Sequence, residues 1–239
     1  MKQRSFKIAS VALLSLASLN ALADESGLKG AGEFGFTKNT GNTESQSVLG
    51  AVKIDYIQPV YEVKSAFSVN NKSENDVQTQ ERYVADLQYN RFYAEDKSYY
   101  SFVQARFEKD DFADLELDSL YTFGLGKTLL KNDKHLLKGE AGIGFQNTNY
   151  IVAEDEDQMI LRLKADYAYQ INEHVAFTQD AIVYAGDNQT KFETNSGLKV
   201  ALAGDLSLKA GFQYRHNSDP GADAEKTDTQ TTLTVIYDF

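Results

Sequence analysis

The chain has 239 residues, a formal net charge of −11 at pH 7, three histidines and no cysteine. The absence of cysteine excludes disulfides, zinc–thiolate sites and thiol nucleophiles, and three histidines make a His-rich metal site unexpected. The acidic charge disfavours nucleic acid and anionic membrane surfaces as partners. No cofactor is therefore expected.

The first 23 residues have the features of a secretory signal peptide. Lys2, Arg4 and Lys7 are basic, an apolar run follows over 8–22, and residues 21–23 read Ala-Leu-Ala. We predict a signal peptide over residues 1–23 and one domain over residues 24–239. A membrane anchor is the alternative, but the apolar stretch is short and no stop-transfer flank follows it.

The rest of the chain alternates apolar and polar residues at every second position. This period is typical of β-strands with two different faces, and helical periodicity is nearly absent. Both prolines, Pro59 and Pro220, read as connection residues. In chain order, we count twelve alternating segments, centred on residues 34–36, 48–56, 61–69, 83–93, 99–107, 117–125, 137–145, 159–169, 177–183, 192–202, 206–214 and 233–239.

The predicted strands are long enough to cross a bilayer at a tilt. Short links at 58–59, 94–97, 131–134, 171–174 and 203–205 alternate with longer polar links at 41–46, 71–78, 109–114, 149–157, 186–189 and 217–225. This arrangement predicts an all-β fold, a transmembrane antiparallel up-and-down β-barrel of about 12 strands, with both ends on the short-turn side. The mean hydropathy of −0.44 is compatible with it, because half of each strand faces a polar lumen.

The aromatic residues favour the same class. The chain has 14 Tyr and 14 Phe but no Trp, and many of these rings fall at strand ends. Amphipathic rings there form the girdles of an outer-membrane barrel. In a soluble β-domain the same rings would be ordinary cross-strand packing partners.

Four stretches resemble the YdiY-like family of salt-induced outer-membrane proteins, the domain-of-unknown-function 481 group. They are "GEFGFTKNTGNTESQSVLGAVKIDY", "DDFADLELDSLYTFGLGKTLL", "GEAGIGF" and the terminal strand that ends at Phe239. Ser119 and Leu120 stand where such proteins often carry a basic residue. The resemblance implies a β-barrel, an outer-membrane location and a link to salt stress, but no known activity.

No catalytic constellation is evident, so we predict that the protein is not an enzyme. His135 and His174 fall at predicted turns, and His216 lies near Ser218 and Asp219. A serine or aspartate enzyme would need an oriented base, and nothing in the sequence marks a partner for His216. The loop motif 41–45 is interpreted as a tight turn closed by its own hydroxyl groups.

Charged residues fall into two groups. Acidic clusters at 110–114, 154–157 and 219–225 are interpreted as solvated loops, with divalent cations among lipopolysaccharide phosphates as a weaker hypothesis. The second group occupies the strand positions that are predicted to face the lumen, and it includes both positively and negatively charged residues. Its predicted members are Arg82, Arg106, Arg162, Lys164, Lys209 and Arg215, with Asp86, Glu108, Glu116, Asp118, Glu140, Asp166 and Asp228.

Three functions remain open. The favoured one is a structural barrel or narrow passive channel of the outer membrane, linked to envelope or salt-stress adaptation. The alternatives are a lipase- or protease-like barrel enzyme and a soluble periplasmic ligand-binding β-protein. The expected partners are outer-membrane lipid, lipopolysaccharide and, by resemblance to this class, the barrel-assembly machinery, which would read Phe239.

Overall fold

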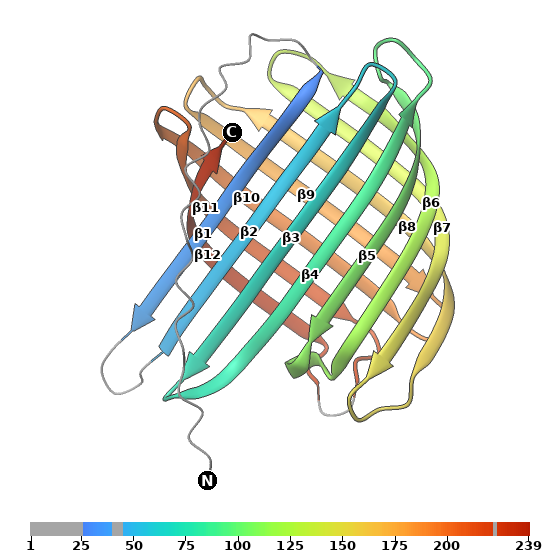
Figure 1. Cartoon of the computed structure of the whole chain (residues 1–239), viewed down its shortest axis with the longest axis vertical. Helices are drawn as coiled ribbons and strands as arrows, with labels where there is room; N and C mark the ends of the chain where they lie inside the picture. The colour runs from blue at the N-terminus through green and yellow to red at the C-terminus, as the bar shows by residue number, and fades with distance from the viewer. Residues whose placement is uncertain (1–25, 40–44, 222–223) are drawn as a thin grey trace.

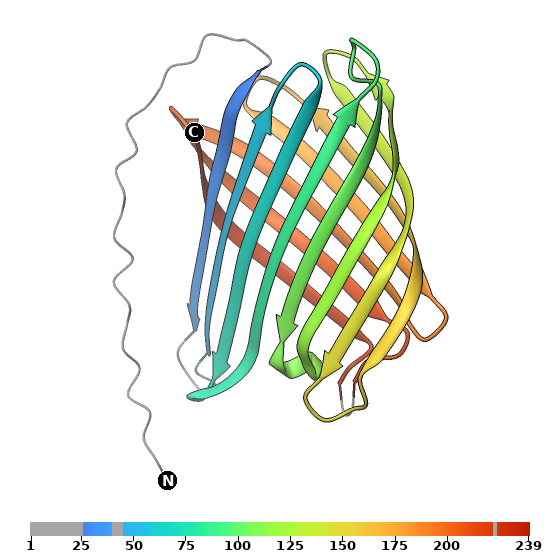
Figure 2. The ribbon, with the colours of Figure 1, turned by 45° about the vertical axis from the view of Figure 1, so that its right-hand side comes forward.

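A computed structural model describes residues 26–39, 45–221 and 224–239. The strands form a closed antiparallel barrel in which sequence neighbours pair and β1 meets β12 (Figures 1 and 2). The predicted barrel and strand number are thus confirmed. The predicted signal peptide and loop positions 41–44 lie outside the described residues. The strands are β1 (Gly27–Asn39), β2 (Ser45–Ile57), β3 (Tyr61–Glu74), β4 (Val77–Phe92), β5 (Tyr99–Asp110), β6 (Leu115–Lys131), β7 (His135–Tyr150), β8 (Glu156–Gln170), β9 (Val175–Gly186), β10 (Thr190–Ala203), β11 (Leu206–Asn217) and β12 (Thr227–Asp238).

Alternation along each strand separates an apolar outer face from a polar interior. On β8 the large apolar residues Met159, Leu161 and Leu163 are exposed, whereas Arg162 between them is fully buried. Successive side chains of a strand point to opposite faces, so this pattern needs no other cause. The described residues contain no helix long and apolar enough to cross a membrane.

β1 and β12 close the barrel through a short seam. Ala31 to Phe34 pair with Asp238 to Val235, and two backbone hydrogen bonds then join Gly30 to Phe239 at 2.6 and 2.8 Å. A side chain at Gly30 would collide with the Phe239 ring, since an added Cβ would lie 2.3 Å from it. The Phe239 ring therefore packs on bare backbone at the end of the seam.

The connections at the two ends of the barrel differ less in length than predicted. The turn end holds both described chain ends and the connections at 58–60, 93–98, 132–134, 171–174 and 204–205. At the loop end, β3 and β4 are joined by Asn75 and Asp76 alone, both with positive φ. Strands β3 and β4 extend into the segment predicted as a loop. Strands β11 and β12 are separated by residues 218–226, whereas the fully described loop-end links have two to five residues.

The lumen wall is bare backbone where β6 meets β7. Gly124 and Gly142 are register partners, and an added Cβ at Gly142 would lie 2.5 Å from the Phe123 carbonyl oxygen. The Phe102 ring occupies the space above Gly142, with its Cζ atom 2.8 Å from the same Cβ position. Glycine is required here because two backbones and a buried ring approach closely.

Replacement of Gly142 by alanine should therefore destabilise the barrel, because the added methyl group meets backbone that cannot move aside. We expect a loss of about 1–3 kcal/mol in the free energy of unfolding, the usual cost of overpacking. Urea unfolding in lipid vesicles would measure it. The control is Gly32→Ala, whose Cβ would have no heavy atom within 4 Å. Equal midpoints for the two variants would contradict the close packing at Gly142.

Candidate functional site

The polar lumen is the candidate site, because the predicted charged residues converge there. Glu116 is the exception among them, since it is exposed beside a β-bulge between Leu115 and Leu117. The alternation of inward and outward side chains does not hold at that bulge, because the extra residue shifts it by one position. The others line the lumen or its loop-end mouth: Arg82, Arg106, Arg162, Lys164, Lys209, Arg215, Asp86, Glu108, Asp118, Glu140, Asp166 and Asp228.

Three arginines and their carboxylates form an ion-pair cluster toward the loop end. Glu108 Oε1 accepts a hydrogen bond from Arg82 Nε at 2.6 Å, and Glu108 Oε2 accepts one from Arg106 Nη2 at 3.1 Å. Glu193, on β10, joins the same two arginines at 3.1 Å each. Arg215 extends the cluster to Asp110 at 3.3 Å and to Asp228 at 3.1 Å. The cluster thus links β4, β5, β10, β11 and β12 across the interior.

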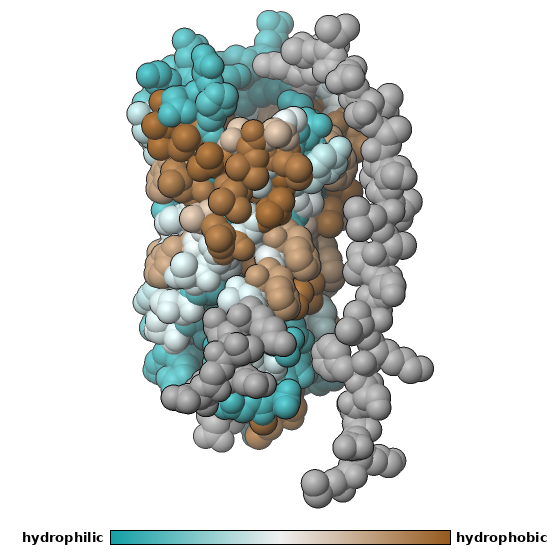
Figure 3. All heavy atoms as spheres, turned by 90° about the vertical axis from the view of Figure 1, so that its left-hand side faces the viewer, coloured by the Kyte–Doolittle hydropathy of each residue, from teal (hydrophilic) through white to brown (hydrophobic). Residues whose placement is uncertain are grey.

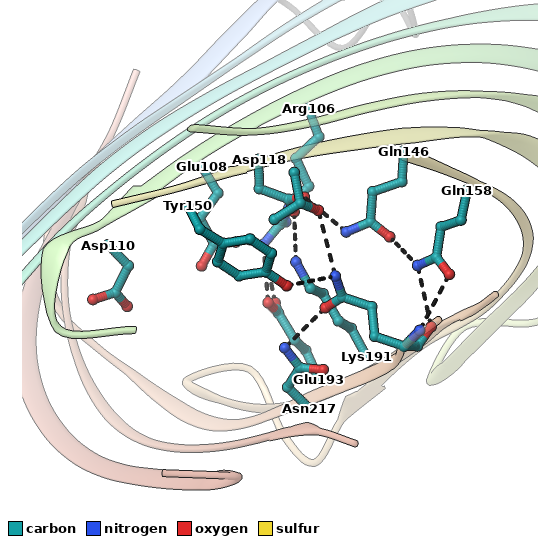
Figure 4. A network of polar contacts seen from close by, with 12 residues as sticks. Arg106, Glu108, Asp110, Asp118, Gln146, Tyr150, Gln158, Lys191, Glu193 and Asn217 are labelled. Atoms are coloured by element: carbon teal, nitrogen blue, oxygen red, sulfur yellow. Dashed lines mark hydrogen bonds and ion pairs between the residues drawn. The ribbon is translucent and has the colours of Figure 1, made fainter. Parts of the chain in front are cut away.

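A second network surrounds Asp118, which is fully buried (Figure 4). Its carboxylate accepts hydrogen bonds from Gln146 at 2.7 Å, Thr148 at 2.8 Å and Lys191 at 2.8 Å. Gln146 in turn accepts from Gln158 at 2.8 Å. Because these buried polar groups bond to one another, their side chains fill this part of the lumen.

Around Gln189 the same network continues to the loop that joins β9 and β10. Gln189 donates to the Tyr150 hydroxyl at 3.1 Å and accepts from Asn217 at 2.9 Å. The Gln158 side-chain oxygen accepts from the Gln189 backbone N–H at 3.2 Å. The loop between β9 and β10 is thereby bonded to the lumen wall.

Toward the turn end, Arg162 and Glu140 form a buried ion pair. Arg162 Nη1 lies 2.8 Å from Glu140 Oε2, at an angle that is not that of a hydrogen bond. The guanidinium stands 4.5 Å from the Phe102 ring centre, and Tyr100 donates to Glu140 at 2.9 Å. Gln88 bridges the pair, since it donates to Glu140 and accepts from Arg162.

The lumen also contains cavities. A cavity of about 580 Å³ at the loop end and two inner cavities of about 440 and 240 Å³ all have Gln213 in their lining. Gln230 lines the loop-end cavity and the smaller inner one. Small inward residues of β1, β2 and β12, such as Thr37, Ser47 and Thr232, leave this space open.

A hydrogen bond between two amide side chains crosses the lumen beside these cavities. Asn70 of β3 donates to Gln230 of β12 at 2.7 Å, across the strands β1 and β2 that separate them in the wall. Gln213 donates to Asn195 at 2.8 Å on the neighbouring strands. These two amide contacts are uncharged, whereas the networks around Glu108 and Arg162 are held by ion pairs.

Sequence reasoning missed Glu193, Lys191 and the glutamines of this lining. The signal was present, because both charged residues alternate with outward Phe192 and Thr194. The glutamines and Asn70 gave weaker signals, since an uncharged polar residue with inward parity is equally common in a strand that faces water.

His216 and His135 contact threonine and tyrosine side chains in the described residues. His216 Nδ1 lies 3.0 Å from the Thr227 hydroxyl, and the Ser218 hydroxyl accepts from the Thr190 N–H at 2.8 Å. His135 stacks on Tyr169 with ring centres 4.6 Å apart. No contact joins His216 to Ser218 in the described residues, so the constellation of a serine hydrolase is not assembled there.

The acidic loop residues bind neighbouring protein groups. Asp114 accepts from the N–H groups of Val152 and Ala153 at 2.9 and 3.0 Å, and Asp155 accepts from the Tyr150 N–H. The described part of the chain contains no group of three or more His, Asp or Glu side chains that could hold a metal ion. Asp223, of the third cluster, lies outside it.

Comparison with known proteins agrees with this architecture. A family model described as "Protein of unknown function, DUF481" matches residues 32–239. The uncharacterized protein YdiY of Escherichia coli (strain K12) is 29% identical in an alignment of 239 positions that covers 92% of each chain.

Two solved structures show the same type of barrel. The COG4313 outer membrane channel from Pseudomonas putida F1 has a TM-score of 0.52 at 6% identity, over 91% of this chain and 97% of that one. The translocator domain of the autotransporter NalP from Neisseria meningitidis has a TM-score of 0.50 at 12% identity, over 90% of this chain and 89% of that one. At such identities the likeness concerns the fold alone.

Breaking the buried ion pair should destabilise the barrel. Glu140→Gln keeps the shape of the side chain but leaves Arg162, whose side chain has no exposed surface, without its counter-charge. We expect a loss of about 3–5 kcal/mol in the free energy of unfolding, measured by urea titration in lipid vesicles. Asp111→Asn is the control, because it breaks the exposed pair with Lys109 and should leave the midpoint unchanged. Equal stability of both variants would show that Arg162 is not dependent on Glu140.

Proposed function

The chain belongs to the DUF481 family of proteins of unknown function, and we propose that it is an outer-membrane β-barrel acting as a narrow passive channel for small polar solutes. The single observation that carries this proposal is a set of three cavities in the lumen that share one lining residue, Gln213.

The outer face supports a membrane location. Leu125 is 68% exposed and Leu163 47% exposed, and exposed apolar residues of this size recur around the barrel. A soluble protein rarely exposes so large a continuous apolar surface. This face disfavours the soluble periplasmic alternative. The turn end, which holds both described chain ends, would then face the periplasm.

The lining supports a path for polar solutes without strong charge preference. Mixed charge in a narrow pore favours weak ion selectivity. The larger inner cavity carries both signs in nearly equal number. Its charged lining residues are Lys53, Lys64, Arg82, Arg106 and Lys164, with Asp55, Asp86, Asp180 and Glu193.

A barrel enzyme is the second candidate, and no specific observation favours it. The link to salt stress is supported by the family resemblance alone. Comparing the amount of protein in cells grown at low and high salt tests that link, and equal amounts would remove it from the proposal.

Conductance in a planar bilayer tests the channel. Ala51 lines the larger inner cavity from β2, so Ala51→Trp should obstruct the path and lower the single-channel conductance by roughly twofold or more. Val52→Trp is the matched control. Val52 is the next residue and points outward, with 44% exposure, so its replacement should leave the conductance unchanged. An absence of current steps in the unmodified protein across several salts would overturn the channel and leave a structural barrel.

Deletion of Phe239 should impair assembly more than conductance. The deletion removes two backbone hydrogen bonds of the β1–β12 seam and the ring that covers Gly30. It also removes the terminal aromatic group that we expect the barrel-assembly machinery to recognise. Heat-modifiable gel migration of outer-membrane fractions measures the folded amount, with Phe239→Tyr as a control that keeps ring and backbone. Normal folded levels after the deletion would contradict both roles of Phe239.

A further inference from the structure

The two inner cavities of the lumen share four lining residues. Lys53, Asp180, Asn195 and Gln213 line both the cavity of about 440 Å³ and the one of about 240 Å³. These residues come from β2, β9, β10 and β11. The two cavities therefore adjoin at this group, which we call the junction.

Lys53 points into the lumen at the junction. Its sequence neighbours Val52 and Ile54 are exposed on the outer face, and successive side chains of a strand point to opposite faces. Figure 3 shows one side of this outer face, with hydrophobic residues gathered between more hydrophilic ends of the barrel. Lys53 is exposed as well, and because it lines both inner cavities, its exposed surface faces the lumen.

Among the cations that line the two inner cavities, Lys53 alone forms no ion pair within the described part of the chain. The other five each have a carboxylate partner: Lys64 has Glu62, Arg82 and Arg106 have Glu108, Lys164 has Asp166, and Lys209 has Glu33. Glu33 faces the lumen from the neighbouring strand β1, but it already accepts hydrogen bonds from Lys209 and Thr234. Lys53 is thus a free positive charge in the lumen.

Asp180 supplies a carboxylate at the same junction. Its Oδ2 atom accepts a hydrogen bond from Asn195 at 2.8 Å, and Asn195 in turn accepts one from Gln213 at 2.8 Å. Among the residues that the structure describes, no cation forms an ion pair with Asp180. The two amides therefore hold this carboxylate in place without neutralising it.

The smaller inner cavity isolates these two charges. Its charged lining residues are Lys53, Asp180 and Lys209. Lys209 is neutralised, because its Nζ atom lies 3.0 Å from both oxygens of Glu33. One free positive charge and one free negative charge remain at the junction.

Two further carboxylates, Asp55 and Asp86, line the larger inner cavity without an ion pair in the described residues. Asp86 accepts a hydrogen bond from Gln104 at 2.6 Å, and Asp55 is the register partner of Lys64. Neither of them is among the lining residues of the smaller cavity, so they stand apart from the junction.

Opposite charges that do not pair with each other favour a solute that carries both. A purely cationic solute would meet the Lys53 ammonium group, and a purely anionic solute would meet the Asp180 carboxylate, so each would face a like charge. A zwitterion can instead satisfy both groups with charge-assisted hydrogen bonds.

We propose that the junction binds small zwitterions of the amino-acid type. Asp180 accepts hydrogen bonds from the ammonium group of the solute, and Lys53 donates to its carboxylate. This inference deepens the proposed function and rests on it for a lumen open to small solutes, but it does not depend on passage through the barrel.

Saturation-transfer NMR on the folded barrel in deuterated detergent micelles tests the site, with β-alanine as the probe. β-Alaninamide carries only the positive charge of β-alanine, and N-acetyl-β-alanine carries only the negative one. We expect β-alanine to bind about tenfold more tightly than either analogue, because each analogue loses one charge-assisted hydrogen bond.

Neutral variants assign the two charges. Lys53→Gln should lower the affinity for β-alanine about tenfold and abolish its advantage over β-alaninamide. Asp180→Asn should lower it to a similar extent and abolish the advantage over N-acetyl-β-alanine. Lys64→Gln and Asp86→Asn are the matched controls, since both residues line the larger cavity away from the junction, and they should leave the affinity nearly unchanged. Heat-modifiable gel migration checks that each variant is folded.

Equal affinities of the three compounds for the unmodified protein would overturn the zwitterion site, as would no binding of β-alanine. An unchanged affinity for β-alanine in either folded junction variant would also overturn it. The channel and the site fail separately. Binding without current steps keeps the site and removes conduction, whereas current steps without a preference for β-alanine keep conduction and remove the site.

Discussion

Backbone hydrogen bonding in apolar surroundings is the constraint on which this structure depends. A strand that faces lipid must find partners for all its N–H and C=O groups, and only a sheet closed on itself provides them. Closure then divides every strand into an outward and an inward set of side chains. Charge is costly on the outward face within the membrane, so charged residues are concentrated in the inward set, where they meet and pair in the interior.

That crowding explains the asymmetry of the lumen. Arg162, Asp118 and Glu108 come from the strands β4–β10, where long side chains meet in ion pairs and amide contacts. The strands β1, β2 and β12 contribute several short side chains, such as Thr37, Ser47 and Thr232, to the walls of the loop-end and smaller inner cavities. The barrel is thus neither a plain pore nor a solid plug.

The seam between β1 and β12 is the weakest part of the closure. The ladder between β1 and β12 covers only Ala31 to Phe34 of β1, whereas β1 pairs with β2 from Gly27 to Asn39. One short seam therefore connects the stability of the fold with the position of Phe239.

Much of this could be predicted from single residues and their spacing. Alternation predicted the strand number and all but one of the inward charges considered. It failed at Glu116, where a bulge shifts the parity, and at the loop lengths, because β3 and β4 continue past polar residues. The partners in each ion pair could not be predicted, because residues such as Arg162 and Glu140 lie on different strands and no local sequence feature relates them.

By itself the sequence determined which face each side chain takes, because the period of two is a local property of an extended backbone. The tertiary structure alone decided which inward groups meet, where the lumen stays hollow and where the seam ends. These depend on register and strand tilt around the whole barrel, and a shift of a strand by two residues would keep every face while changing every partner.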